Sequence, residues 1–135
     1  MKKYAWLLAC LVAPCSMAGE VQLQISGCVV GQTVRVGLYP PTQDFPKRGE
    51  MQRQDVVATS ETISVKFAEV AAGRYAVAAY LDSNHNQKLD RSWLGAPSER
   101  YGFSNNARNL FSAPSFEQAG FAVSTTPVLQ SILLH

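Results

Sequence analysis

The sequence is poor in the residues that most often carry catalysis and metal chemistry. Its 135 residues include three cysteines and two histidines, and the motifs GxSxG, HExxH and CxxC do not occur. This shortage argues against a zinc site. The long apolar run at residues 4–14 is too short for a transmembrane helix, which needs roughly 20 residues. Beyond that run, no segment has a helical period over three turns.

The first 18 residues have the pattern of a secretory signal peptide. Lys2 and Lys3 precede the apolar run, and Ser16-Met17-Ala18 ends in the small-x-small pattern of a cleavage site. The run Leu7 to Cys10 resembles a lipoprotein box, but cleavage there would leave an apolar region of only about six residues, which argues against a lipid anchor. We predict a signal peptide over 1–18 and an exported domain over 19–135, periplasmic or secreted.

Removal of this leader would change the charge and the cysteine count. The chain has 12 basic and 10 acidic residues, so the loss of Lys2 and Lys3 leaves 12 − 2 = 10 of each sign. A neutral domain gives no reason to expect nucleic acid as a partner. Only Cys28 remains, which excludes an internal disulfide. We predict that Cys28 is a small buried residue, with an intermolecular bridge or a reactive thiol as alternatives.

A period of two dominates the remaining chain. Apolar residues alternate with polar ones over 21–26, 33–38, 62–67 and 121–123, and a last strand is expected over 128–134. Residues 74–81 are apolar on both sides, which predicts a central strand. In the 33–38 segment, the residues expected to face water are Thr33, Arg35 and Gly37. The connecting residues 27–32 and 71–73 are short enough for hairpin turns. We predict an all-β fold: a single antiparallel Greek-key β-sandwich of six to seven strands.

Residues 91–120 form a long stretch without a clean period. Such a stretch in a compact domain is uncommon and is often functional. It is too rich in aromatic residues for a disordered tail, since it contains Trp93, Tyr101, Phe103, Phe111 and Phe116. We predict an aromatic lid over one open end of the sandwich, with a ligand-contacting surface over 93–116 as the alternative.

The segment LDSNHNQKLD, residues 81–90, resembles a calcium-binding loop. Calcium is bound by six to eight oxygen ligands, and a tightly coiled loop presents alternate residues to the ion. The pattern D-x-[DN]-x-[DN]-G places Asp82, Asn84 and Asn86 at loop positions one, three and five. The Lys88 carbonyl would then be the seventh-position ligand, and Asp90 falls at position nine. These residues are the candidate metal ligands.

Two departures from the pattern predict that this site is weak. Position six is Gln87 where the sharp turn favours glycine, and position twelve is Trp93 where a bidentate glutamate is usual. Glu99 is the nearest later carboxylate and would have to supply the missing ligand. We expect an affinity of about 10⁻⁴ to 10⁻³ M. An ordinary polar turn is the alternative, because Asp and Asn also favour turns without an ion.

Three segments together, residues 73–77, 82–90 and 94–106, resemble the bacterial exported family catalogued as domain of unknown function 2141. The resemblance extends from about Val21 to Val123. It implies a sandwich related to transthyretin-like or carboxypeptidase-regulatory-like domains, and the family has no established activity. Leu81 replaces the family's histidine, Gln87 its loop glycine and Arg100 a further glycine. The candidate ligands, apart from the Lys88 carbonyl, match the family pattern: Asp82, Asn84, Asn86, Asp90 and Glu99.

The resemblance also pairs two motifs, the first over residues 82–90 and the second over 94–106, which implies that Glu99 folds back onto the Asp82 loop. Our first hypothesis is therefore an exported non-enzymatic binding or structural module with a weak calcium loop, whose protein or small-molecule partner is unknown. A small envelope hydrolase is the second, with a cleft between the 82–90 loop and the 93–116 segment. It would need His85 beside Asp90 or Glu99. An assembly subunit that pairs through an exposed edge strand is the third.

Overall fold

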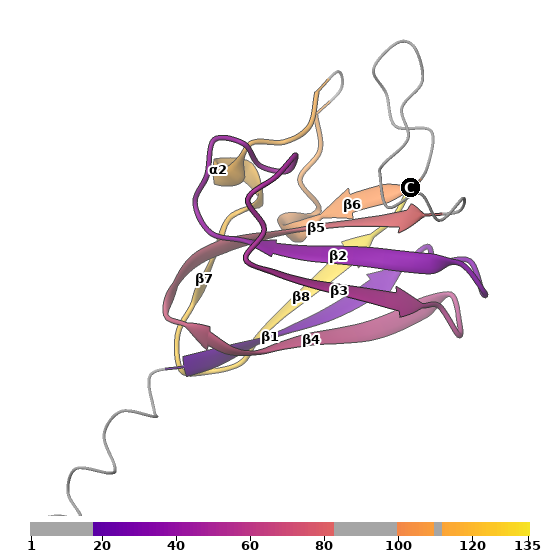
Figure 1. Ribbon diagram of the computed structural model, residues 1–135, viewed down its shortest axis with the longest axis horizontal. Coiled ribbons are helices and arrows are strands. Elements are labelled where there is room, and N and C mark those ends of the chain that lie inside the picture. Colours follow the sequence, from indigo (N-terminus) through magenta and orange to yellow (C-terminus); the bar gives the residue numbers. More distant parts are fainter. Residues whose placement is uncertain (1–17, 83–99, 110–111) are drawn as a thin grey trace, which may run out of the picture.

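Two β-sheets pack face to face in the computed structural model, which describes residues 18–82, 100–109 and 112–135 (Figure 1). The three-stranded sheet has the order β4-β1-β8, and the larger sheet has the order β3-β2-β5-β6 with β7 paired to β5. The three-stranded sheet comprises β1 Ala18–Ser26, β4 Thr62–Ala71 and β8 Val128–Leu133. The larger sheet comprises β2 Thr33–Tyr39, β3 Gln52–Val57, β5 Gly73–Asp82, β6 Tyr101–Phe103 and β7 Phe121–Val123.

This architecture confirms the predicted all-β sandwich. The described residues contain eight strands where six or seven were predicted, and β3 and β6 are the ones that were not foreseen. Most pairs are antiparallel, but β1 and β8 run parallel. Two short helices, η2 Ser104–Asn106 and α2 Phe116–Ala119, lie in the stretch that showed no period. The signal peptide prediction falls on residues 1–17, which lie outside the described residues, and on Ala18, where β1 begins.

The main core lies between the two sheets and comes from the alternation seen in the sequence. The inward-facing residues of β1, β2 and β4 are all buried: Val21, Leu23, Ile25, Val34, Val36, Leu38, Ile63, Val65 and Phe67. Cys28 belongs to the same core, where its thiol contacts the Ile25 carbonyl oxygen at 3.4 Å. Burial raises the pKa of this thiol, which keeps it in the unreactive protonated form. Cys28 is therefore the small buried residue that the sequence predicted.

The two short connections predicted as hairpin turns are crossings between the sheets. Residues 27–32 lead from β1 to β2, and residues 71–73 lead from β4 to β5, so each joins strands of different sheets. The prediction of hairpins was wrong because loop length alone does not distinguish a hairpin from a tight corner at the end of a sandwich. Gly27 has a positive φ of 82°, a conformation that favours glycine, and a Cβ there would lie 2.3 Å from the Leu134 carbonyl oxygen.

A second core covers part of the outer face of the five-stranded sheet. Its buried members come from β2, β5, β6, α2 and the 40–51 loop: Tyr39, Phe45, Ala76, Phe103, Phe116 and Ala119. The Phe45 ring makes edge contacts with Tyr39, Phe103 and Phe116 at centroid distances of 4.9, 5.9 and 6.3 Å. The aromatic segment thus packs on a sheet face rather than over an open end, which corrects the predicted position of the lid. Trp93 and Phe111 lie outside the described residues.

β6 and η2 tie the two sheets together on one side. Gly102 lies against β8 so closely that a Cβ would be 2.7 Å from both the Ile132 Cγ2 and the Leu133 carbonyl oxygen. The Ser104 hydroxyl accepts from the Val77 amide at 2.9 Å and donates to the Ala119 carbonyl at 2.6 Å. Asn105 and Asn106, both with positive φ, hydrogen-bond to β8 through Gln130 and the Leu133 amide. The YGFSNN part of the second motif is therefore a structural connection.

Candidate functional site

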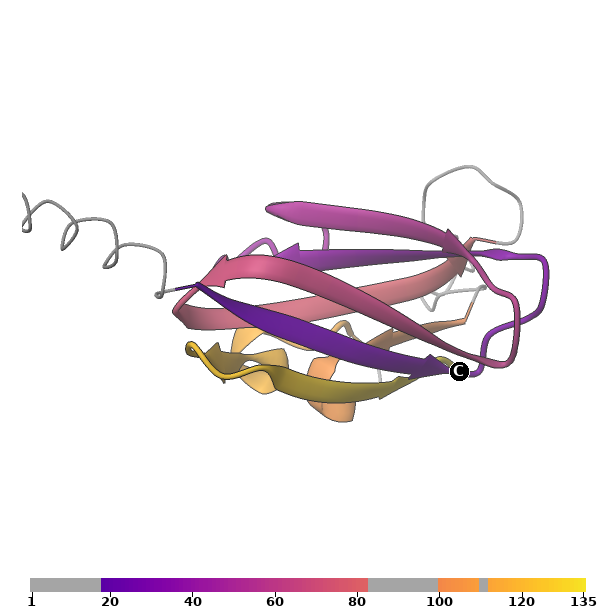
Figure 2. The same cartoon turned by 90° about the horizontal axis from the view of Figure 1, so that it is seen from below.

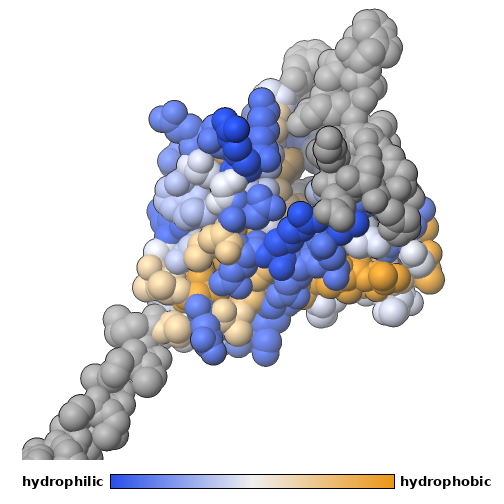
Figure 3. Space-filling view, viewed as in Figure 1, coloured by the Kyte–Doolittle hydropathy of each residue, from blue (hydrophilic) through white to orange (hydrophobic). Residues whose placement is uncertain are grey.

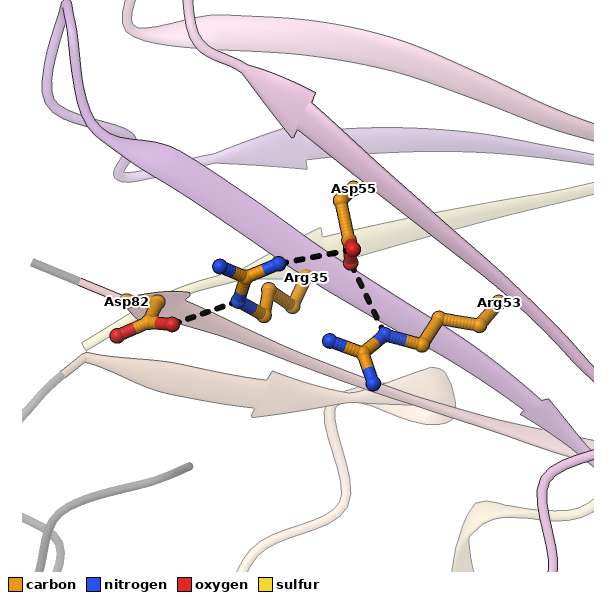
Figure 4. Close-up of polar contacts among 4 residues, drawn as sticks. All are labelled: Arg35, Arg53, Asp55 and Asp82. Atoms are coloured by element: carbon orange, nitrogen blue, oxygen red, sulfur yellow. Dashed lines mark hydrogen bonds and ion pairs between the residues drawn. The ribbon is translucent and has the colours of Figure 1, made fainter. Parts of the chain in front are cut away.

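A chain of four charged side chains crosses β5, β2 and β3 on the outer face of the five-stranded sheet, beside the second core (Figure 4). Arg35 is at its centre. The Arg35 Nε donates to Asp82 Oδ2 at 2.6 Å, and its Nη1 lies 2.8 Å from Asp55 Oδ2. Arg53 Nε donates to the other oxygen of Asp55 at 3.1 Å. We call Arg35, Arg53, Asp55 and Asp82 the charge ladder.

Strand register explains why these side chains meet. Arg35 lies opposite Asp55 on β3 and opposite Tyr80 on β5. Successive side chains alternate between the faces of a strand, so Asp82, two residues beyond Tyr80, lies on the same face and within reach of the long arginine side chain. The expectation that Arg35 faces water was wrong, because every residue of β2 is buried and the second core and the charge ladder cover this face.

Burial makes the Arg35–Asp82 pair the strong contact of the charge ladder. The Asp82 side chain is 0% exposed and that of Arg35 is 10% exposed, whereas the Asp55 side chain is 38% exposed. The hydrogen bond that Arg35 donates to Asp82 raises the pKa of Arg35, against the opposing effect of burial. A buried carboxylate needs such a partner, and removal of one partner from a buried pair typically costs about 3–5 kcal/mol. Arg35 therefore fixes the side chain of the first predicted calcium ligand.

The structure also places Asp82 beside Arg100, the residue that follows the predicted calcium segment. Asp82 is the last residue of β5, and Arg100 immediately precedes β6. β5 and β6 are antiparallel neighbours with Tyr80 opposite Tyr101, and the Leu81 amide donates to the Arg100 carbonyl at 2.9 Å. The chain thus leaves the sheet at Asp82 and returns to it at Arg100, at adjacent positions.

Of the predicted ligands, the structure describes Asp82 alone. Asn84, Asn86, Lys88, Asp90 and Glu99 lie outside the described residues, as does His85 of the enzyme hypothesis. Within 18–82, 100–109 and 112–135, no group of three or more His, Cys, Asp and Glu side chains is placed to hold a metal ion. The ligand set and the enzyme hypothesis therefore stay predictions.

Sequence reasoning missed Arg35 as a site residue. The only indication of such a role in the sequence was a charged residue at the centre of a predicted strand. Its neighbours in the strand, Val34 and Val36, are apolar and face inward. A lone arginine on the outer face of a strand is ordinarily solvated, so the sequence alone gives no reason to pair it with Asp82, 47 residues later.

Two tyrosines adjoin the charge ladder on the same face. Tyr80 and Tyr101 are cross-strand neighbours on β5 and β6, and the Arg108 guanidinium lies 5.3 Å from the centre of the Tyr101 ring. Burial, with a smaller contribution from the Asp82 carboxylate, raises the pKa of Tyr80. Figure 3 shows this side of the molecule with hydrophilic residues over its middle and hydrophobic ones toward both ends of the strands. The combination of charge and aromatic rings suits polar ligands or partners.

Comparison with known proteins places the chain in a family. None of the described helices is long and apolar enough to cross a membrane. No curated protein and no solved structure matches the chain, so the predicted relation to transthyretin-like domains stays a prediction. A family model described as an uncharacterised protein conserved in bacteria, DUF2141, matches residues 30–130, which are 101 of the 135 residues and include both motifs and the whole charge ladder. The chain therefore belongs to the DUF2141 family.

Proposed function

We propose that this protein is an exported, non-enzymatic binding or structural module that binds calcium weakly in the segment from Asp82 to Glu99. The observation that carries the proposal is the adjacency of Asp82 and Arg100 across β5 and β6. Glu99 directly precedes Arg100 in the chain, and consecutive Cα atoms are about 3.8 Å apart. Glu99 is therefore joined to a residue whose backbone is hydrogen-bonded to β5. The two halves of the predicted ligand set therefore start from neighbouring points.

The charge ladder supports both the binding and its weakness. Arg35 pairs with the Asp82 carboxylate at 2.6 Å although that side chain is 0% exposed, and so holds a carboxylate, the kind of group that binds calcium, at the start of the segment. The same guanidinium carries a fixed positive charge 2.6 Å from the ligand carboxylate, and it would repel a bound cation. An affinity of about 10⁻⁴ to 10⁻³ M, typical of extracellular modules, is consistent with this arrangement.

Export gives the proposed site a compartment in which such an affinity suffices. The leader-like pattern over residues 1–18 supports export, and extracellular calcium reaches the range in which weak sites fill. Without calcium, Arg35 neutralises Asp82, so the domain would fold in either state. With calcium bound, the 82–99 segment would present the surface that recognises a partner.

Thermal unfolding with and without calcium tests this function. A site with a dissociation constant of about 0.5 mM would gain about 1.4 kcal/mol at 5 mM calcium, because only the folded state binds the ion. For a domain of this size that corresponds to a rise in Tm of about 6 °C. Differential scanning calorimetry in chelator, in calcium and in magnesium at equal ionic strength would measure it. An unchanged Tm in calcium, or an equal rise in magnesium, would refute the calcium site.

Isosteric variants locate the effect. Glu99→Gln removes a predicted ligand charge and should reduce the calcium-dependent rise by at least half. Glu117→Gln is the matched control, since Glu117 is exposed on α2 and far from the end of β5 (Figure 1). If both variants keep the full rise, the ion binds elsewhere.

A further inference from the structure

β3 is an edge strand with an open outer side. It ends the order β3-β2-β5-β6, and no described strand pairs with its other side. Figure 2 shows β3 along one margin of the molecule. β3 and β4 are edge strands of different sheets, and one described side-chain hydrogen bond links them, from the Gln54 amide to the Lys66 carbonyl oxygen. An open edge of this kind is able to pair with another strand.

The register with β2 identifies the backbone groups that remain available. The Ala58 amide donates to the Gln32 carbonyl at 2.9 Å, and the pairing continues with Val34 opposite Val56. In an antiparallel ladder, alternate residues bond to the same neighbour. The even-numbered residues of β3 therefore bond to β2, whereas Arg53, Asp55 and Val57 turn their amides and carbonyls outward.

The side chains along this edge carry both signs of charge and two exposed apolar groups. Arg53 and Asp55 lie on the outer face of the sheet, with side chains 36% and 38% exposed. Met51, just before β3, is 47% exposed, and Val57, at its end, is 56% exposed. The order along the strand is thus apolar, positive, negative, apolar at positions 51, 53, 55 and 57.

This order is complementary to itself under a two-fold rotation. An antiparallel pairing centred on Gln54 places Arg53 opposite Asp55 of a second copy and Met51 opposite its Val57, with residues 53 and 55 in hydrogen-bonded pairs. Centring on residue 53 would place arginine against arginine, and centring on residue 55 would place aspartate against aspartate. Among the registers that use the outward backbone groups, the one centred on Gln54 pairs opposite charges.

We propose that β3 pairs with β3 of a second copy of this chain, antiparallel, with the two-fold axis at Gln54. The five-stranded sheets of the two copies would join into one continuous sheet. The charge ladder would extend across the axis, because Asp55 would contact Arg53 of the second copy as well as Arg35 of its own. Met51 and the six residues of β3 would bury well below about 1,000 Å² in total, which is typical of a weak, reversible dimer.

Charge complementation tests this pairing. Arg53→Glu leaves two acidic residues on the edge, and Asp55→Lys leaves two basic ones. Each variant alone should self-associate at least tenfold more weakly than the parent chain, because like charges then meet across the axis. A one-to-one mixture should recover the association, since the introduced glutamate would face the introduced lysine and the remaining Asp55 would face the remaining Arg53. Sedimentation equilibrium from about 10 µM to 1 mM covers the range expected for so small an interface.

A cross-link tests the register even if Asp55→Lys does not fold. Gln54→Cys places two thiols on the axis in a non-hydrogen-bonded pair, where Cα atoms about 4.5 Å apart permit a disulfide. Gln52→Cys is the matched control, since its two copies would lie about 13 Å apart in this register. A dimer cross-linked through residue 54 and not through residue 52 supports the proposal. A parent chain that is monomeric throughout, equal cross-linking at both positions, or a mixture no more associated than its components overturns it.

Discussion

The outer face of the five-stranded sheet has two halves, one covered by aromatic side chains and the other by paired charges. In the aromatic half, Phe45 and Phe116 come from outside the sheet and pack over Tyr39 and Phe103. In the charged half, the charge ladder lies on strands of the sheet itself, and its side chains neutralise one another. The aromatic half is thereby closed by its own chain. The charged half ends at Asp82, where the predicted calcium segment begins.

The two halves differ in what their side chains contribute: the aromatic half contributes to stability, and the charged half holds Asp82 in place. Burial of a phenylalanine among aromatic rings contributes to folding and requires no ligand. A buried ion pair stabilises less than its Coulomb attraction suggests, because both charges lose their hydration. The Arg35–Asp82 pair is better explained by what it holds in place, which in this chain is the last residue before the 83–99 segment.

The largest expected effect comes from the aromatic half. Phe45→Ala removes the ring that touches Tyr39, Phe103 and Phe116, and it should lower the free energy of unfolding by about 3–5 kcal/mol. Urea denaturation would measure the loss. Phe45→Leu keeps most of the apolar volume and should recover more than half of it. The calcium-dependent rise in Tm should survive in both variants, and its loss would show that the two halves are not separable.

Much of the fold could be predicted from the sequence, because alternation records which side of a strand is buried. β2, β5, β7 and β8 match their predicted segments to within one residue at each end, whereas β1 begins before its predicted segment and β4 ends beyond it. β3, with the sequence QRQDVV, was missed because an edge strand with one half-exposed side carries little apolar alternation. The parallel pairing of β1 with β8 was also missed, since periodicity within a strand says nothing about which strand becomes its neighbour.

Less of the candidate site could be predicted. The paired motifs indicated that residues 82 and 99 belong together. The structure places Asp82 beside Arg100 but does not describe Glu99, so this pairing stays a prediction. The role of Arg35 could not be foreseen, because it depends on the register of β2 against β5 and β3. The aromatic segment was expected at an open end, but Phe103 and Phe116 found partners in Tyr39 and Phe45, which are distant in sequence.

A second test removes the buried carboxylate of the charged half. Asp82→Ala leaves the buried Arg35 with Asp55 alone and should lower the free energy of unfolding by about 3 kcal/mol in chelator. The calcium-dependent rise in Tm should also disappear, because the first ligand is lost. Calorimetry in chelator and in calcium separates these two effects.

Asp55→Ala is the matched control for that test, since Asp55 also pairs with Arg35 but lies on β3. Its side chain is 38% exposed, so its loss should cost only about 1 kcal/mol after screening by solvent, and the calcium response should remain. If Asp82→Ala unfolds too readily to measure, Asp82→Asn keeps the shape and removes the charge. A calcium response that survives Asp82→Asn would contradict the role of this carboxylate.

The smallest expected effect concerns Gln87, at the loop position that favours glycine. A left-handed conformation costs an L-residue roughly 1–2 kcal/mol, and glycine avoids that cost. Gln87→Gly should therefore lower the dissociation constant for calcium about fivefold, which adds about 1 kcal/mol to the calcium-dependent stabilisation at saturation. Gln87→Ala is the control, because it removes the side chain beyond Cβ but keeps the cost. Calorimetric calcium titrations of both variants decide the point: an equal gain in the two would show that side-chain bulk limits binding, whereas a gain in the glycine variant alone locates the weakness of the site in the backbone at position 87.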